Sequence, residues 1–436
     1  MQSLNKELNN IGFKNIKDFG VIGDGATNDT DNFIIALSKC NKLFIPNGIY
    51  IINTINLPDN TTILGESSSA IIKQNSTNNH VINCGNNTNI INLTIDGNCE
   101  NKNGQYGCIK GCGKNNIIID NCIIKNGIQW CVYFNSCNFV KITNTEICYC
   151  KNGAGCTIAG NNDGYNIIEN CYSHNNRLDG IAIGQPYVTI KKCCCKLNGL
   201  IDNGACGIFM NSNAHYALID SNVCDHNGGI GIEIAGDSKQ VRIINNSITN
   251  NEYDGIEIRQ NHKCIIIGNY LFNNGSPLFN SQISYSASSG NFYSVIDNNI
   301  IDCNGRTGYG IYAPNINNCM GNNIVIGETI SKILASKTGN LSAAGGDVYE
   351  LFSRKYIRYT DNRMMNIINA GNNTRIIIAG NQDFEVVNTS GGHARILQDA
   401  HMLSTPPNTP QNGDFYLTSN GINVYYANSW KTLSWK

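Results

Sequence analysis

Two glutamates of the chain occupy matching positions, Glu233 in Gly231-Ile-Glu-Ile and Glu257 in Gly255-Ile-Glu-Ile. If these segments are neighbouring strands in register, both side chains leave the sheet on the same face, about 5 Å apart. Carboxyls this close repel each other as anions, so the pKa of one rises and the pair can act as general acid and general base. The spacing is near the ~5–5.5 Å of retaining glycosidases, and side-chain splay reaches the ~6.5–9.5 Å of inverting ones. We predict that Glu233 and Glu257 are catalytic.

Other charged residues lie close to this pair in the sequence. Asp254 and Asp237 flank it and are included as catalytic candidates. Arg259 follows Glu257 by two residues, so it points the same way and is predicted to bind an acidic or hydroxyl-rich substrate. The alternative is a set of solvated charges on an exposed sheet, with Arg259 neutralising the glutamates. The catalytic interpretation depends on the strand register, because a slip of one residue turns a glutamate inward.

The position of the two glutamates recurs in other segments that open with a small residue. Its neighbours are apolar, which predicts that the resulting column faces outward. The column consists of Tyr133, Thr157, Ala182, Phe209, Glu233, Glu257 and Tyr312. Its aromatic members, Tyr133, Phe209 and Tyr312, are predicted together with Trp130 to be substrate-binding platforms for sugar rings. The alternative for each is an ordinary surface or core side chain.

Three further positions carry groups that could do chemistry. Asp96 precedes a glycine, where turn formation is the alternative explanation. His174 and His226 stand just before turn asparagines, and Asp225 could orient His226 as a base; decoration of a corner is the alternative. If Glu233 and Glu257 are not the catalytic pair, the next candidates are Asp202, Asp225 and His226.

No metal and no cofactor is expected. Although the chain has 20 cysteines, neither the run Cys193-Cys194-Cys195 nor the pair Cys148 and Cys150 has the C-x-x-C spacing of a zinc site. The N-terminus is polar and has no apolar signal-peptide region, which predicts synthesis in a reducing compartment and free thiols. Cysteines inside predicted strands are expected to be small buried apolar residues: Cys122, Cys171, Cys206, Cys224 and Cys264.

Charge and hydropathy narrow the class of partner. A net charge of −1 and a pI near 6.6 give no support for binding nucleic acid or an anionic membrane. Only 14% of residues are charged, so asparagine, serine and threonine must supply much of the polar surface. Such a surface suits contact with neutral or acidic sugars. No run approaches the ~18 apolar residues of a membrane span.

The candidate residues belong to a repeat that extends from about residue 115 to 304. Short β-branched strands alternate with turns, and a turn asparagine returns roughly every 22 to 30 residues. The turn column is Asn126, Asn152, Asn176, Asn198, Asn227, Asn251, Asn274 and Asn304. A second column precedes it, interrupted by Lys192: Asn121, Asn144, Asn170, Asn222, Asn246, Asn269 and Asn299.

A repeat of this period predicts a solenoid of strands, a parallel β-helix, in which each coil buries its apolar face on the next. Asparagines in register are predicted to form internal amide ladders and to accept the left-handed backbone of sharp corners. An asparagine-rich disordered tract is the alternative. It does not explain why the apolar residues keep phase with the asparagines over eight turns.

The N-terminal part predicts a closed end for this solenoid. Residues 32–40 read as a short helix with Asp29 or Thr30 as its cap, and a strand and a Pro46-Asn-Gly turn accompany it. Together they would cover strand edges that an open solenoid exposes. The phrases of this region are Asp18-Phe-Gly, Gly23-Asp-Gly, Asn28-Asp-Thr, Pro46-Asn-Gly-Ile-Tyr and Leu64-Gly-Glu.

These phrases resemble the start of the pectate-lyase-like β-helix superfamily, which includes pectin-degrading enzymes, some glucanases and bacteriophage tailspike depolymerases. With the repeats, the resemblance covers about residues 12–327. It implies an all-β fold, a right-handed parallel β-helix with a short N-terminal capping helix and a C-terminal β-rich assembly domain; the crossover rule implies the same hand. Polygalacturonase signatures and the epimerase Asp-Pro-His motif are absent, so no catalytic residue is transferred from the family.

The resemblance implies a phage tailspike-like protein that binds and cleaves a bacterial surface polysaccharide, as a glycosidase or a lyase. A receptor-binding virion spike without activity is one alternative, and a cellular pectate-lyase-type enzyme is another. The expected partners are the polysaccharide, two further copies in a homotrimer and other tail proteins, with no nucleic acid and no membrane insertion. The expected location is the virion tail, after synthesis in the host cytoplasm.

The C-terminal part has a different composition. Cysteine is absent after Cys319, which predicts a domain boundary near residues 320–340. We predict a cap and first coils at 1–66, the β-helix at 67–327, a β-rich region at 328–404 and a small β-meander module at 405–436. The meander is too small to stand alone, and its aromatic residues Tyr425, Tyr426, Trp430 and Trp435 are expected to be buried against other subunits.

Overall fold

A computed structural model describes residues 8–338, apart from 9, 76–78, 101, 202–203, 237, 260–262, 276–280, 286–293, 305–308, 321–322 and 327–330, and beyond them seven strands between 365 and 434. The chain divides into two compact units, residues 1–339 and 340–436. None of the described helices is long and apolar enough to cross a membrane. The division of the chain into four regions, 1–66, 67–327, 328–404 and 405–436, stays a prediction.

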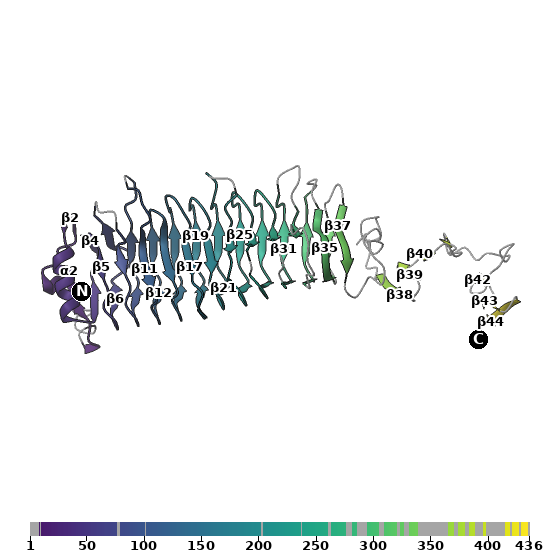
Figure 1. Cartoon of the computed structure of the whole chain (residues 1–436), viewed down its shortest axis with the longest axis horizontal. Helices are drawn as coiled ribbons and strands as arrows, with labels where there is room; N and C mark the ends of the chain where they lie inside the picture. The colour runs from purple at the N-terminus through teal and green to yellow at the C-terminus, as the bar shows by residue number, and fades with distance from the viewer. Residues whose placement is uncertain are drawn as a thin grey trace. The chain divides into compact units, whose positions relative to one another are not determined.

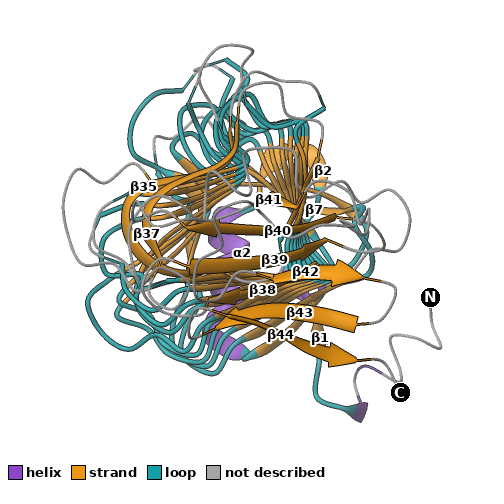
Figure 2. Ribbon diagram, turned by 90° about the vertical axis from the view of Figure 1, so that its right-hand side faces the viewer, coloured by secondary structure: helices purple, strands orange, loops and turns teal. Residues whose placement is uncertain are grey.

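The first unit is a parallel β-solenoid with three strands per coil, which stack into three faces (Figures 1 and 2). Face A consists of β1 Lys14–Asn15, β3 Lys42–Ile45, β6 Thr62–Gly65, β9 Asn89–Ile91, β12 Ile118–Asp120, β15 Lys141–Thr143, β18 Ile167–Glu169, β21 Thr189–Lys191, β24 Leu218–Asp220, β27 Arg242–Ile244, β30 Ile265–Ile267 and β33 Val295–Asp297.

Face B consists of β2 Asp24–Asn28, β4 Gly48–Ile52, β7 Ala70–Gln74, β10 Thr94–Asp96, β13 Ile123–Lys125, β16 Glu146–Cys148, β19 Tyr172–His174, β22 Cys194–Lys196, β25 Val223–Asp225, β28 Ser247–Thr249, β31 Tyr270–Phe272, β34 Ile300–Asp302 and β36 Ile324–Ile326.

Face C consists of β5 Ile55–Asn56, β8 Ile82–Asn83, β11 Gly107–Cys112, β14 Trp130–Asn135, β17 Cys156–Ala159, β20 Ile181–Gly184, β23 Ile208–Met210, β26 Ile232–Ile234, β29 Ile256–Ile258, β32 Ile283–Tyr285 and β37 Ser331–Thr338. The long strand β35 Tyr309–Met320 pairs with strands of both face C and face A.

Aliphatic ladders fill the interior of the solenoid. Strands of faces A and B are mostly three residues long, and the middle residue points inward. Ile119 of β12, for example, is fully buried and pairs with Ile90 one coil before and Ile142 one coil after. This stacking buries apolar surface that one coil alone would expose, so the coils stabilise one another. The predicted all-β parallel solenoid is confirmed.

Two buried amide ladders join the coils, as the sequence predicts. In the first, the side-chain amide of each asparagine donates to the Oδ1 of the next through Asn176, Asn198, Asn227, Asn251 and Asn274, at 2.8–3.1 Å. In the second, the same bonds run through Asn222, Asn246, Asn269, Asn299 and Asn323. Each amide also satisfies buried backbone groups, which an apolar residue would leave unpaired.

Each predicted asparagine column combines two adjacent positions, a corner with left-handed backbone and a buried ladder position. Asn121, Asn144, Asn170 and Lys192 occupy a corner position with φ of 51–54°, whereas the buried ladder position beside it holds Cys122, Thr145, Cys171 and Cys193 in those coils. Asn126 and Asn304 likewise lie in the left-handed corner next to the first ladder. Asparagine suits both places, because it tolerates left-handed backbone and can bond its stacked neighbour.

The predicted N-terminal helix is present as α2 Thr30–Lys39, preceded by the 3-10 turn η1 Ile16–Phe19. It lies at the first-coil end of the stack (Figure 1) and buries Phe33, Ala36 and Leu37. Asp29 is the N-cap residue, but its carboxylate accepts hydrogen bonds from the N–H groups of Ile22 and Gly23, at 2.7 and 2.9 Å, rather than from the helix. That α2 protects the end of the solenoid stays a prediction.

The five cysteines predicted to lie in strands are buried, as predicted, but only Cys224 lies within a strand, and the other four lie outside the strands. Cys122, Cys171, Cys206, Cys224 and Cys264 are at most 3% exposed. The 19 cysteines whose side chains the structure describes, all except Cys319, are free. The buried ones contribute as small apolar groups in the ladder and core positions.

The second unit contains two antiparallel sheets. The first is formed by β38 Met365–Asn369, β39 Thr374–Ala379, β40 Asp383–Asn388 and β41 Ile396–Leu397. The second is formed by β42 Phe415–Thr418, β43 Gly421–Tyr426 and β44 Ser429–Ser434, where the sequence predicts a three-stranded meander. The role of this unit in assembly stays a prediction.

Candidate active site on face C

The two glutamates lie in register on neighbouring coils. Glu233 of β26 pairs directly with Glu257 of β29, and the preceding and following residues of both strands are fully buried isoleucines. The predicted column is continuous along face C, from Tyr133 through Thr157, Ala182, Phe209, Glu233, Glu257 and Ser284 to Tyr312. The register inferred from the leading glycines is therefore confirmed.

The glutamates are not solvated. Glu233 is 3% exposed and Glu257 is 8% exposed, so the solvated charges of the alternative interpretation are wrong, whereas Arg259 forms ion pairs with both glutamates, as that interpretation expected. Groups from neighbouring coils cover the carboxyls. The Cys206 thiol donates to Glu233 Oε2 at 3.1 Å, and Arg259, whose side chain is 50% exposed, lies over both glutamates.

Arg259 bridges the pair. Its Nη2 donates to Glu257 Oε2 at 2.9 Å, and its Nε lies 3.1 Å from Glu233 Oε1. The Nε–H is not aligned with that oxygen, and Glu233 Oε1 is a buried atom without a hydrogen-bond partner. Burial raises the pKa of Glu233, and Glu257 adds to the rise, while the Cys206 thiol and Arg259 oppose it. Glu233 is thus a carboxyl with one oxygen still able to bind a proton or a donor.

Two aspartates adjoin the pair, each just before the glycine that opens a strand. Asp254 accepts hydrogen bonds from the backbone N–H of Ser281 and from Ser284 Oγ, the latter at 2.7 Å. Burial raises its pKa to about 7. Asp179 accepts from the backbone N–H of Cys206 at 2.7 Å, and burial, with a contribution from Glu233, raises its pKa to about 6.

Asp179 is absent from the sequence-based candidates. The sequence does contain a pattern that identifies Asp179, because Asp179-Gly180 precedes a strand in the same way as Asp254-Gly255. Cys206 was predicted only as a buried apolar residue, yet its thiol contacts Glu233. Asp237 lies outside the described residues.

The predicted aromatic residues lie along the same face and are half-buried. Trp130 stacks on Tyr133 with ring centroids 4.3 Å apart and an interplanar angle of 21°. Phe209 pairs directly with Glu233, and Tyr312 lies two coils beyond Glu257 with its ring 5.2 Å from that of Tyr309. The stack of Trp130 and Tyr133 uses one face of each ring. Sugar binding by these residues stays a prediction.

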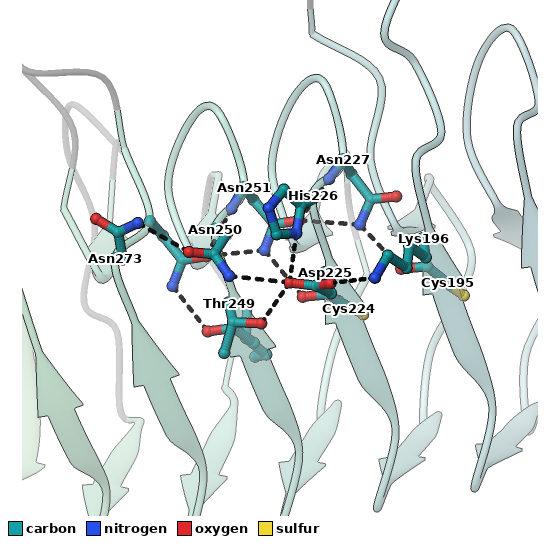
Figure 3. Close-up of polar contacts among 12 residues, drawn as sticks. Cys195, Lys196, Cys224, Asp225, His226, Asn227, Thr249, Asn250, Asn251 and Asn273 are labelled. Atoms are coloured by element: carbon teal, nitrogen blue, oxygen red, sulfur yellow. Dashed lines mark hydrogen bonds and ion pairs between the residues drawn. The ribbon is translucent and has the colours of Figure 1, made fainter.

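The reserve candidates Asp225 and His226 lie on a different face, at the end of β25 in face B (Figure 3). Asp225 Oδ1 accepts from Thr249 Oγ1 at 2.7 Å and from Asn250 Nδ2 at 3.1 Å, and His226 Nδ1 lies 2.8 Å from it. Lys196 Nζ lies 3.0 Å from Oδ2.

Burial alone would raise the pKa of Asp225, but the hydrogen bonds from Asn250, Thr249, His226 and Lys196 outweigh it and lower the pKa. This carboxylate is held as an anion, which makes it a poor general base. His226 has a φ of 52°, so it occupies the left-handed corner. Asp202 lies outside the described residues.

A separate groove follows the corner after face B. It has a volume of about 770 Å³ and is lined by charged and aromatic side chains that include Lys73, Asp96, Tyr149, Lys151 and Arg177. Asp96 accepts from the backbone N–H of Asn98 and from Asn126 Nδ2, both at 2.9 Å, so it stabilises the corner as the turn interpretation predicts. The glutamate pair does not line this groove.

Comparisons with known proteins agree with the fold. A pre-neck appendage protein of Bacillus phage B103 is 26% identical over 279 residues, which are 58% of this chain and 28% of that protein, so the chain spans less than a third of it. The A-module of the mannuronan C-5 epimerase AlgE4 of Azotobacter vinelandii has a TM-score of 0.63 at 15% identity, covering 75% of this chain and 100% of that one. The Dettilon tailspike protein has a TM-score of 0.53 at 18% identity, covering 86% and 78%.

Two family models match successive parts of the chain. The model for rhamnogalacturonase A/epimerase, pectate lyase-like, matches residues 13–203, and the model for the right-handed beta helix region matches residues 198–348. These matches agree with the three parallel faces described above, so the chain is similar over residues 13–348 to pectate-lyase-like proteins and to right-handed β-helices.

Proposed function

We propose that the chain is a phage tail component that binds a bacterial surface polysaccharide and cleaves it at Glu233 and Glu257. The similarity to a phage pre-neck appendage protein, to a tailspike and to a polysaccharide-modifying module supports the setting. The observation that supports the chemistry is the buried Oε1 of Glu233, which forms an ion pair with Arg259 at 3.1 Å but no aligned hydrogen bond, beside the ion pair of Glu257 with the same arginine.

The residues divide the chemistry between them. The exposed part of Arg259 binds a carboxylate or hydroxyl of the sugar, since a guanidinium offers donors beyond those that face the glutamates. Glu233, with its raised pKa, donates a proton to the leaving oxygen. Asp254, whose pKa is about 7, is poised to exchange protons at neutral pH. Glu257 serves as the second carboxylate, either toward water or toward a sugar proton.

Glu233→Gln and Glu257→Gln test this proposal, because each keeps size and hydrogen bonding while removing the acid or base. Incubation with host capsule or O-antigen, followed by assays of reducing ends and unsaturated products, measures cleavage and separates hydrolase from lyase. Loss of a general acid or base costs about 10²–10⁴ in rate, with sugar affinity nearly unchanged. Glu169→Gln is the matched control, since Glu169 pairs with Lys191 at 3.2 Å on face A. Wild-type rates in both variants would sink the assignment.

Binding without cleavage is the second candidate, and the burial of both glutamates favours it. A substrate would reach Arg259 first, so the site could hold an acidic sugar without chemistry. Retention of the polysaccharide by the wild-type protein, with no product over long incubation, identifies this case.

A further inference from the structure

A second group of side chains converges on face B, apart from the glutamate pair. Glu146 and Cys148 are the outer residues of β16, on either side of the buried Ile147. His174 ends β19 and pairs in register with Cys148, one coil away. Stacking therefore brings a carboxylate, a thiol and an imidazole together from two strands.

The three donor atoms lie at distances that suit one cation. His174 Nε2 is 3.0 Å from Glu146 Oε1, and Cys148 Sγ is 3.7 Å from the same oxygen. The nitrogen, the sulfur and the oxygen all lie within 4.8 Å of one another. A tetrahedral Zn²⁺ with ordinary bond lengths would separate N from O by roughly 3.3 Å and S from O by roughly 3.5 Å.

The contact at Nδ1 indicates which nitrogen of a neutral His174 ring carries the proton. Its Nδ1 lies 2.7 Å from Asn175 Oδ1, which can only accept, so Nδ1 carries the proton. Nε2 lies 3.0 Å from Glu146 Oε1, so with the ring proton on Nδ1 the nitrogen lone pair and the carboxylate oxygen can bind one cation. Tyr172 stacks on the imidazole at 4.0 Å, and Tyr149 meets it edge-on at 5.7 Å, which fixes the orientation of the ring.

We propose that Glu146, Cys148 and His174 bind Zn²⁺ or a similar borderline divalent cation, with the fourth position open to water. Sulfur and imidazole ligands select such ions over Ca²⁺ and Mg²⁺. A thiolate and a carboxylate balance the two positive charges. Asn175 acts as the outer-shell partner that sets the imidazole tautomer. Because the side chain of Glu146 is 39% exposed and that of His174 9% exposed, the open position faces solvent on the glutamate side.

Two lysines flank the site along the same row. Lys125 pairs with Cys148 one coil earlier. Lys196 pairs with His174 one coil later, but it is bound to Asp225 at 3.0 Å. The sequence predicts no metal because it has no C-x-x-C spacing. That criterion detects ligands close together in the sequence, and it misses ligands from different coils that stacking brings together.

Cobalt and zinc binding to the full chain test the proposal. After treatment with a chelator, we expect one tightly bound equivalent of Zn²⁺ by equilibrium dialysis and a thiolate-to-metal absorption band on Co²⁺ substitution. Cys148→Ser should abolish the band and the tight equivalent, and His174→Gln should abolish the tight equivalent. Glu146→Gln, at a half-exposed position that folding tolerates, should weaken binding at least about tenfold.

Two controls separate this site from adventitious binding by thiols or histidines. Cys194→Ser removes a half-buried thiol from the next coil, and His226→Gln removes a histidine that contacts a carboxylate without a thiol. Both should keep the tight equivalent. The proposal is overturned if the wild type binds no stoichiometric metal, or if the stoichiometry and affinity persist in both Glu146→Gln and His174→Gln.

Discussion

At the scale of single residues, the environment of each carboxyl separates groups that look alike in the sequence. Asp254 and Asp225 both end or precede strands of the solenoid, yet burial raises the pKa of the first to about 7, while hydrogen bonds and Lys196 lower that of the second. Asp225 has more hydrogen-bond donors than Asp254, and the cation Lys196 lies 3.0 Å from it. Asp254 is therefore suited to proton exchange, and Asp225 to holding a corner together.

This difference predicts opposite pH dependences of stability. In the unfolded chain Asp254 has a pKa of about 3.9. Since folding raises it to about 7, the folded state holds a proton that the unfolded state has released, and stability falls as the pH rises from about 4 to about 7. Asp254→Asn should flatten the decline of Tm across that window.

Asp225→Asn serves as the contrast in the same thermal unfolding series. Its carboxyl has a lowered pKa, so its contribution is present above about pH 4 and is lost as the pH falls toward the folded pKa. That variant should be destabilised at neutral pH and approach the wild type in acid. Parallel Tm curves for Asp254→Asn and the wild type would show that Asp254 is ionised throughout.

At the scale of elements, the amide ladders are expected to contribute most per residue. Asn251 accepts from the backbone N–H and the Nδ2 of Asn227, and it donates to Asn274 Oδ1 at 2.8 Å and to the Cys224 carbonyl at 3.0 Å. Asn251→Ala leaves several of these buried groups unpaired and should cost roughly 2–4 kcal/mol of unfolding free energy.

Denaturant titration measures this cost, and Asn115→Ala is the matched control. Asn115 accepts from Asn138 Nδ2 at 3.0 Å in an exposed ladder, where water can replace the bond. Its loss should stay within about 0.5 kcal/mol. Equal costs at the two positions would mean that burial does not decide the value of the ladder.

Corner geometry gives a prediction of the opposite sign. Lys192 has a φ of 54°, a conformation that costs most side chains roughly 1–2 kcal/mol and that asparagine tolerates. Lys192→Asn should therefore stabilise the protein by about 0.5–1 kcal/mol, because the lost contact with Glu169 is 4.0 Å long and the lysine side chain is 67% exposed. Lys191→Asn, in the adjacent strand, removes a closer contact at 3.2 Å without relieving strain and should not stabilise.

The sequence predicts the repeat and its register better than it predicts which side chains from other coils bury a given residue. The leading glycines Gly231 and Gly255 give the register of Glu233 and Glu257, since a repeat aligns equivalent residues. The sequence placed Arg259 beside the glutamates, but it did not predict the burial of Glu233, because Cys206 contacts it from a neighbouring coil. The sequence also does not separate the corner asparagines from the ladder asparagines, because the two positions are adjacent and both accept asparagine. Only backbone geometry distinguishes Asn170, at a corner, from Asn222, in a ladder.

At the scale of the whole molecule, the solenoid gives each face a continuous row of equivalent positions. Face C carries the carboxyl pair with the aromatic residues, and face B carries Glu146, Cys148 and His174 together with Lys196 and Asp225. A chain polymer that follows the axis would meet several such positions in sequence. This arrangement suits an extended polysaccharide better than a small ligand, whose contacts would fit within one coil.

Assembly is predicted from the second unit. Its two antiparallel sheets have four and three strands, and sheets this small need packing partners for stability. We expect three copies to supply them, so the full chain should sediment as a homotrimer, whereas a chain ending at residue 339 should sediment as a monomer. Analytical ultracentrifugation at micromolar concentration distinguishes the two. A monomeric full-length chain with an intact C-terminus would contradict the prediction, and a trimeric truncated chain would move the contacts to the solenoid.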